Sequence, residues 1–214
     1  VESVVEEARR YGITTPIHPV PSIFIGAADV IPLQLFSAFT APASLGLRAA
    51  PIGIRRVEDA DGNVLWEPQR RRERVMNVDQ AFVLNDMLRD VVRYGTASAA
   101  IRQAGFRFPA GGKTGTTDDY TDVWFVGFTR ELVAGVWIGF DRPQTIRVGA
   151  QGGRMAAPAW ATFMREVYER RPDPGEWPRP AGAASLLGAG AASATTPKTQ
   201  PAGNAAAEAP RRPR

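Results

Sequence analysis

The sequence predicts an α+β fold in which an antiparallel sheet is flanked by helices, and three observations indicate it. Residues 111–117, 121–129 and 132–140 read as three extended runs joined by short turns, and short turns favour antiparallel pairing. The third run has apolar side chains on both faces, so its strand is expected to be covered on both sides. From Pro158 onward, a wide apolar stripe at helical spacing predicts a helix that lies on this sheet, formed by Trp160, Phe163, Met164, Val167 and Tyr168.

Two helices are expected before residue 45. Residues 1–11 read as the end of an amphipathic helix that is stopped by Gly12. The prolines of the following stretch exclude regular helix up to about residue 26, since proline lacks the N–H that a helix needs. The next helix starts near Pro32, and Leu35, Phe36 and Phe39 share one of its faces.

A hairpin and a third helix follow. Asp61-Gly62 is a strong turn signal between two short extended runs. Asn77, with Gln80 three residues later, marks the start of a helix, and Gly95 closes it. The basic segment 55–74 is interpreted as a solvated hairpin and loop, and a partner-binding site is the alternative.

The composition predicts one folded domain, residues 1–171, and a tail, residues 172–214. The tail is rich in Ala, Pro, Gly, Thr and Ser, so we expect it to be disordered because it cannot bury enough surface to offset its ordering entropy. A formal charge of +4 is too slight and dispersed for nucleic-acid binding. The absence of cysteine excludes disulfides and thiolate metal sites, and one histidine excludes a histidine metal cluster. The aspartates of DDYTD, residues 118–122, are interpreted as turn residues, because their spacing misses the calcium-loop pattern.

One of only two lysines, Lys113, lies between glycine and hydroxyl residues in GGKTGTT, residues 111–117. A phosphate-binding loop would need a glycine where Arg107 stands and a helix directly after the lysine, which argues against nucleotide binding. If only the triplet Lys-Thr-Gly is considered, it can also be interpreted as an ordinary strand whose lysine points to solvent. The other interpretation is a serine acyl-transfer enzyme of the penicillin-recognising type, whose motifs include Lys-Thr-Gly. A strand at the lip of a groove can pair with an extended peptide, and Lys113 would supply a compact positive charge there.

Longer segments favour the second interpretation. FPAGGKTGTTDDYTDVWFVGFTRELVAGVWIGFD resembles the third-motif region of class A bifunctional penicillin-binding proteins, of the penicillin-binding protein 1A type. RVMNVDQAFVLNDMLRDVVRYGTA resembles the helix and turn that precede that region, and GGRMAAPAWATFM resembles the closing helix. The resemblance runs over roughly residues 1–170 in the order of the family, and it identifies the chain as similar to the C-terminal part of the transpeptidase domain.

The resemblance implies a serine β-lactamase/D,D-transpeptidase-like fold that is incomplete here at its N-terminal side. It also implies cross-linking of peptidoglycan stem peptides through a serine acyl-enzyme, binding of β-lactam antibiotics, and no metal or cofactor. By match to the motif, Lys113 and Thr116 would be catalytic, and the Thr116 N–H would stabilise an oxyanion. Thr114 and Thr116 would contact the terminal carboxylate of the substrate. The expected substrate-binding residues are Lys113, Thr114, Gly115, Thr116 and Thr117.

The family also uses a Ser-x-x-Lys motif and a Ser-x-Asn motif, and no serine of this chain fits either pattern. We expect both motifs upstream of Val1 in the same protein, with a glycosyltransferase domain and a membrane anchor further upstream. The intact protein would then act on the periplasmic face of the inner membrane, and the chain alone would be inactive. The alternative is a non-catalytic penicillin-fold module that serves as a scaffold or sensor in cell-wall assembly. The codons before Val1 would discriminate between the two.

Overall fold

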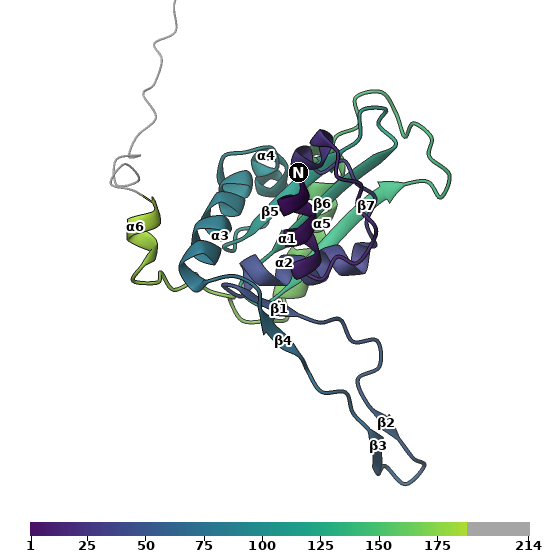
Figure 1. The fold of residues 1–214 in the computed structure, drawn as a ribbon, viewed down its shortest axis with the longest axis vertical. Helices are drawn as coiled ribbons and strands as arrows, with labels where there is room; N and C mark the ends of the chain where they lie inside the picture. The colour runs from purple at the N-terminus through teal and green to yellow at the C-terminus, as the bar shows by residue number, and fades with distance from the viewer. Residues whose placement is uncertain (188–214) are drawn as a thin grey trace, which may run out of the picture.

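A three-stranded antiparallel sheet lies between layers of helices in the computed structural model, which describes residues 1–187 (Figure 1). The sheet has the order β5-β6-β7, with β5 at Gly111–Thr116, β6 at Asp122–Phe128 and β7 at Val133–Gly139. Lys113 of β5 pairs with Val126, and Val126 pairs with Gly135 of β7. The antiparallel sheet flanked by helices and the order of its three strands confirm the prediction.

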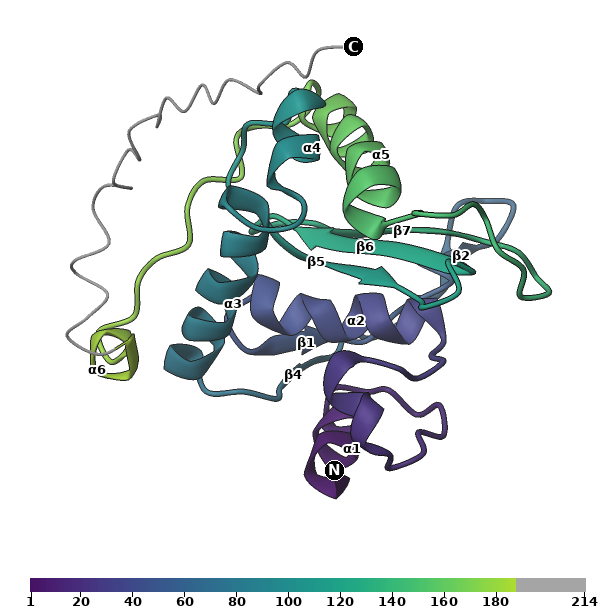
Figure 2. The same cartoon turned by 90° about the horizontal axis from the view of Figure 1, so that it is seen from above.

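Helices cover both faces of the sheet (Figure 2). On one face, α5 (Gly152–Tyr168) and α4 (Ser98–Gln103) enclose the main core, where Trp160 is 0% exposed and its ring centroid lies 5.3 Å from that of Phe125. On the other face lies α2 (Pro32–Ala43), and a Cβ on Gly135 would lie 2.1 Å from the Phe36 ring. The glycine in β7 therefore lets α2 approach the sheet, and the expected coverage of both faces is confirmed.

Helix α1 ends and helix α3 begins at the predicted signals. α1 (Glu2–Arg10) ends before Gly12, whose φ of +84° suits glycine. α3 (Val78–Arg93) begins after Asn77, whose side chain accepts the N–H of Asp79 at 2.8 Å. Between α1 and α2, the proline-rich stretch contains only the short 3₁₀ helix η1 (Pro21–Ile25). No helix in residues 1–187 is long and apolar enough to cross a membrane.

Helix α5 begins at Gly152, six residues before the predicted start, and Pro158 lies inside it. Glycine and proline are poor helix formers, so local propensity favoured the later start. Contact with the sheet overrides that preference, because Gly152 lies so close to β6 that a Cβ there would stand 2.3 Å from the Trp124 carbonyl oxygen. The predicted apolar stripe is also rotated, since Phe163 is 54% exposed while alanines share the buried face with Trp160, Met164 and Tyr168.

The prediction of a disordered tail is wrong for residues 172–187. Trp177 is 5% exposed and donates its indole N–H to the Ala43 carbonyl at 2.7 Å, and its ring packs edge-on against Phe128. Arg89 of α3 lies over the same indole at 5.2 Å and pairs with Glu176. The short helix α6 (Ala183–Leu187) follows. The prediction was based on average composition, which does not reveal that one tryptophan anchors this segment. The rest of the predicted tail, residues 188–214, lies outside the described residues.

A long hairpin, residues 47–74, projects from the body as an arm (Figure 1). At its base, β1 (Leu47–Ala49) pairs with β4 (Arg72–Arg74), and near its tip β2 (Val57–Glu58) pairs with β3 (Val64–Trp66). Gly62 in the turn has a φ of +84°, as the Asp61-Gly62 signal predicts. The tip hairpin is confirmed, whereas the pairing at the base was not predicted.

Candidate active site on strand β5

Strand β5 is an edge of the sheet, since among the described residues only β6 pairs with it. The Thr117 N–H donates to the Asp122 carbonyl at 3.1 Å, which marks this rung as a hydrogen-bonded pair. Such pairs alternate along an antiparallel ladder, so the rungs of Gly115 and Lys113 are bonded to β6 in the same way. The backbone N–H and C=O groups of Thr114 and Thr116 therefore point away from the sheet, towards its open edge.

Lys113 places its ammonium group at this open edge. Its side chain is exposed on the α2 face of the sheet, and Nζ donates to the outward-pointing carbonyl of Thr114 at 2.8 Å. Among residues 1–187, no carboxylate forms a salt bridge with Lys113. The positive charge is therefore available to an anionic ligand that lies along β5.

The side chains of Thr114 and Thr116 lie on the opposite face of β5, beside the beginning of α5. The Thr116 hydroxyl accepts the N–H of Gly152 at 3.1 Å. A hydroxyl that accepts in this way keeps its own hydrogen for donation to another group. The Thr114 hydroxyl lies 3.0 Å from the Thr96 hydroxyl. Thr96 was not among the predicted site residues.

Gly115 and Thr117 have contacts that differ from those expected of substrate-binding residues. A Cβ on Gly115 would lie 3.2 Å from the Cβ of Trp124, so the glycine relieves crowding within the sheet. The Thr117 hydroxyl accepts the N–H groups of Thr121 at 3.0 Å and Asp122 at 2.9 Å, and it thereby stabilises the β5–β6 turn. The structure thus brings Lys113, Thr114 and Thr116 to one edge, while the side chain of Thr117 serves the turn.

Asp122, the acidic residue at the start of β6, makes contacts within the fold. Asp122 accepts the indole N–H of Trp137 at 2.8 Å and the Thr121 hydroxyl at 2.8 Å. Within residues 1–187, no group of three or more His, Cys, Asp or Glu side chains is arranged to hold a metal ion. The side chain of Asp122 thus joins β6 to β7, and for Asp118 and Asp119 the turn interpretation stays a prediction.

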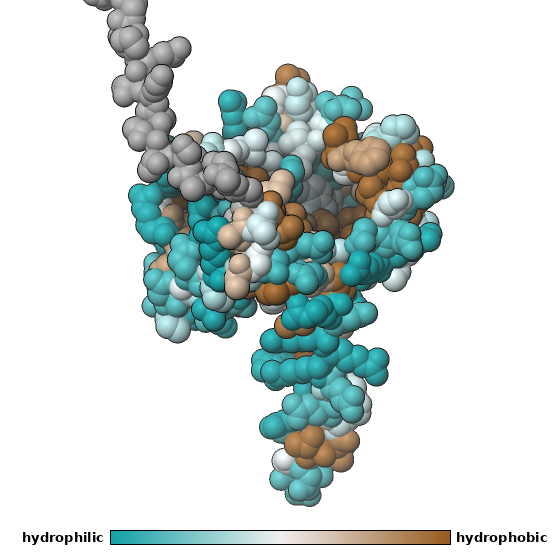
Figure 3. Space-filling model, turned by 60° about the vertical axis from the view of Figure 1, so that its left-hand side comes forward, coloured by the Kyte–Doolittle hydropathy of each residue, from teal (hydrophilic) through white to brown (hydrophobic). Residues whose placement is uncertain are grey.

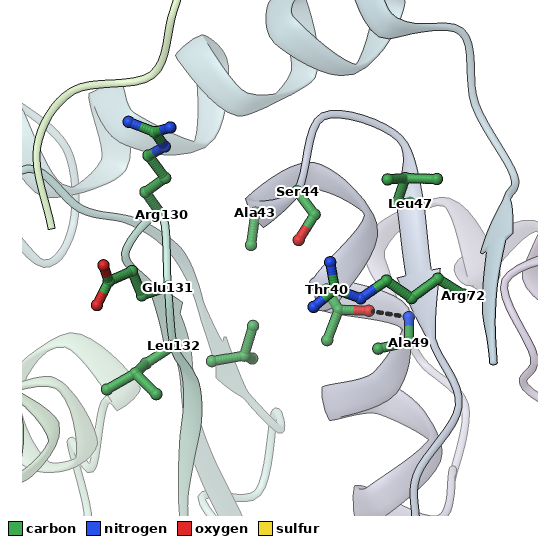
Figure 4. A pocket seen from close by; sticks show the side chains of 10 residues that line it. Thr40, Ala43, Ser44, Leu47, Ala49, Arg72, Arg130, Glu131 and Leu132 are labelled. Carbon is green, nitrogen blue, oxygen red and sulfur yellow. Dashed lines mark hydrogen bonds between the residues drawn. The ribbon is translucent and has the colours of Figure 1, made fainter. Parts of the chain in front are cut away.

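Residues of β5 line neither of two cavities that lie near the base of the arm. The smaller one, about 120 Å³, lies between the β6–β7 turn and the end of α2, with Arg130, Glu131 and Leu132 on one wall and Thr40, Ser44 and Arg72 on the other (Figure 4). The larger one, about 360 Å³, lies at the base of the arm. The edge of β5 is thus open, and neither cavity forms the expected groove around Lys113.

Residues 22–165 match the family model described as the penicillin binding protein transpeptidase domain. Penicillin-binding protein 1A of Aquifex aeolicus is 37% identical over 172 residues, a match that covers 80% of this chain and 23% of that protein. Penicillin-binding protein 2D of Bacillus subtilis is 33% identical over 175 residues, which is 79% of this chain and 25% of that protein. The chain therefore spans about a quarter of the length of these curated relatives.

Solved structures share the fold. The crystal structure of penicillin-binding protein 1A from Haemophilus influenzae superposes with a TM-score of 0.73 at 24% identity and covers 80% of this chain and 31% of that one. The PonA1 protein from Mycobacterium tuberculosis, solved in complex with penicillin V, gives a TM-score of 0.66 at 20% identity, over 81% of this chain and 51% of that one. The strand edge that carries Lys113 thus lies in a fold that these proteins have in common.

Proposed function

The chain belongs to the penicillin-binding protein transpeptidase domain family, and we propose that it supplies the substrate-binding strand of a peptidoglycan transpeptidase. One observation carries the proposal: the ammonium of Lys113 and the outward-facing backbone of Thr114 and Thr116 share the open edge of β5. A stem peptide in extended form would add to this edge as a further strand, and its backbone would be bound without reading its side chains.

Each residue of the edge has a role in this proposal. The Thr116 hydroxyl accepts the Gly152 N–H, which holds the hydroxyl in place. It donates its own hydrogen to the terminal carboxylate of the peptide. The Thr114 hydroxyl, which lies 3.0 Å from the Thr96 hydroxyl, donates to the same carboxylate, and in that arrangement Thr96 would be the donor between the two hydroxyls. The Thr116 N–H stabilises the oxyanion that forms during acyl transfer, and the loss of one such donor costs on the order of 10²–10³ in rate. Lys113 adds positive charge next to both groups.

The reaction proceeds through an acyl-enzyme on a serine that lies outside this chain. The serine oxygen attacks the penultimate D-alanine carbonyl, the peptide bond breaks, and the terminal D-alanine leaves with the serine proton on its amine. An amine of a second stem peptide then attacks the ester and restores the serine. A β-lactam acylates the same serine, since its strained amide takes the place of the peptide bond. Glycosyltransferase activity, a membrane anchor and an extracytoplasmic location belong to the proposed intact protein.

The scaffold or sensor alternative is not favoured. A module that had lost its catalytic role could also have lost the motif on this strand, whereas β5 keeps the lysine, both threonines and the glycines that β6 packs against. The named relatives are all penicillin-binding proteins.

The proposal is tested by the rate at which the full-length protein is labelled by a fluorescent penicillin. Lys113→Ala is expected to slow labelling by about 10²-fold, as for other groups that stabilise the transition state electrostatically. Arg102→Ala, which removes an exposed cation from α4, is the matched control and should label at the wild-type rate. A normal labelling rate for Lys113→Ala would contradict the assignment of the site to β5.

A further inference from the structure

A second surface, at the base of the arm, has the features of a binding site. The groove of about 360 Å³ is lined by Ala49, Ala50, Ile52, Arg55, Arg70, Arg71 and Arg72. It shares Ala49 and Arg72 with the smaller cavity next to the β6–β7 turn, which Figure 4 shows, so the two cavities are neighbours. No residue of β5 takes part, so this surface is separate from the candidate active site.

The charge of the groove at the base of the arm is unbalanced. Two neighbouring arginines outside the groove have acidic partners, since Arg48 pairs with Glu73 and Arg56 pairs with Glu58. Among residues 1–187, the four arginines that line the groove form no salt bridge. Of the carboxylates in the described part of the chain, only that of Glu131 lines either cavity. Like charges gathered in this way repel one another, and an anionic ligand with planar carboxylates would relieve the repulsion.

The arm also leaves backbone groups and apolar side chains without cover. Its two sides are joined by the bond from the Ala50 N–H to the Arg71 carbonyl at 3.1 Å, and no further backbone hydrogen bond connects them until β2 and β3 pair. Five apolar side chains of the arm are between 42% and 64% exposed, namely Ile52, Ile54, Val64, Leu65 and Trp66. Figure 3 shows an apolar patch near the tip of the arm beyond a hydrophilic shaft, and strand β3 near the tip carries three of the five, Val64, Leu65 and Trp66. A two-stranded hairpin gains little stability alone in water, so such an arm is suited to packing against a partner.

From these features we infer that the arm binds an acidic, extended segment of another protein. The carboxylates of that segment pair with the groove arginines, its backbone uses the open backbone groups of the arm, and its apolar side chains pack on Ile52 and the tip. An anionic membrane surface fits less well, because Glu58, Asp59, Asp61 and Glu67 surround the apolar tip and would be repelled by anionic headgroups. This inference goes beyond the proposed cross-linking function and does not depend on it.

The test uses the full-length protein and a fluorescein-labelled octapeptide of alternating glutamate and leucine, with binding followed by fluorescence anisotropy. The double variant Arg70→Gln, Arg71→Gln is expected to weaken binding about tenfold, as the loss of two charge-assisted contacts would. The matched control is Arg170→Gln, Arg171→Gln, which removes an exposed arginine pair after α5 and should change the affinity by less than about twofold. The octapeptide with glutamine in place of glutamate should bind at least about tenfold more weakly to the wild type.

Other outcomes would overturn the inference. Equal weakening by the two double variants would mean that binding follows net charge and not the groove. Absence of binding of the glutamate peptide to the wild-type protein would mean that the groove takes no acidic segment. A third outcome is binding of phosphatidylglycerol vesicles that is lost in Arg70→Gln, Arg71→Gln, and it would assign the arm to the membrane surface.

Discussion

The hydroxyl of Thr116 accepts the backbone N–H of Gly152 at 3.1 Å and so joins the edge strand β5 to the first turn of α5. The first N–H groups of a helix have no partner within the helix, and Thr116 satisfies one of them from outside. The same contact fixes the direction in which the hydroxyl can donate. The side chain of Thr116 therefore contributes to the position of β5, to the start of α5 and to the proposed contact with the substrate carboxylate.

Thr116→Val is expected to slow penicillin labelling of the full-length protein by about 10²-fold, because it removes a donor aimed at the ligand. It also leaves the Gly152 N–H without its partner, which costs about 1 kcal/mol in stability. Thr116→Ser keeps the hydroxyl and should restore most of the labelling rate. If Thr116→Val and Thr116→Ser label equally fast, the hydroxyl has no part in ligand binding.

Gly152→Ala is expected to destabilise the domain by at least about 2 kcal/mol through overpacking. The added Cβ would stand 2.3 Å from the Trp124 oxygen and 2.5 Å from the Gly115 oxygen, so α5 and the sheet would have to separate. The shift of the thermal unfolding midpoint measures the effect. Gly53→Ala is the control, since no atom lies within 4 Å of the added Cβ, and its midpoint should stay close to that of the wild type.

Trp177→Ala is expected to lower the free energy of unfolding by about 3 kcal/mol, as the loss of a buried aromatic side chain does. The indole covers Phe128 and donates to Ala43, so its removal opens a cavity and leaves a carbonyl unpaired. Urea denaturation measures the change, with Trp66→Ala on the exposed arm as the control. Equal stability of the Trp177 variant and the control would mean that the segment after residue 172 is not anchored.

The turn at the tip of the arm is expected to loosen in acid. Hydrogen bonds from the side chain and backbone of Asn63 hold the pKa of Asp59 below its ordinary value of 3.8. The ionised form is thus favoured in the folded turn, so its stabilising contribution is present above that value and is lost as the pH falls through the lowered pKa. The amide chemical shift of Asn63 should follow this titration, and Asp59→Asn should abolish the pH-dependent change. A pH-independent shift in the wild type would disprove the link.

The 214-residue chain produced alone is expected to form no covalent adduct with a labelled penicillin, because no serine in it fits the nucleophile motif. We also expect the isolated chain to bind a hydrophobic dye, since apolar side chains near α2 and β7 are exposed, among them Leu33, Trp137 and Phe140. Denaturing electrophoresis and dye fluorescence check the two expectations. A label that survives electrophoresis would refute the first, and a sharp unfolding transition at high temperature would argue against the second.

Local signals predicted the parts of the fold that depend on local chemistry. Asn77 as a helix cap, Gly12 as a helix stop and Asp61-Gly62 as a turn act through their own backbone, so the sequence alone was sufficient for them. The alternation of apolar residues predicted the three strands and their coverage by helices, since burial follows the period of the strand.

The parts that were missed depend on contacts between distant residues. The early start of α5 follows from the approach of Gly152 to Trp124, and the anchoring of the tail follows from Trp177 and Ala43. The hydroxyl pair of Thr96 and Thr114 likewise joins two segments whose contact no local pattern reveals. At the candidate site, the motif predicted which residues reach the edge, but the turn contacts of Thr117 required the folded chain.

The outward donors of β5 belong to the main chain, so no point mutation can delete the N–H of Thr114 or Thr116, except a change to proline. A drug that imitates an extended peptide would pair with these main-chain groups, and only a displacement of the strand could withdraw them from the drug. The strand is held from behind by Gly152 and Gly153, and we therefore expect reduced drug susceptibility to arise at such supporting positions more readily than at the edge itself.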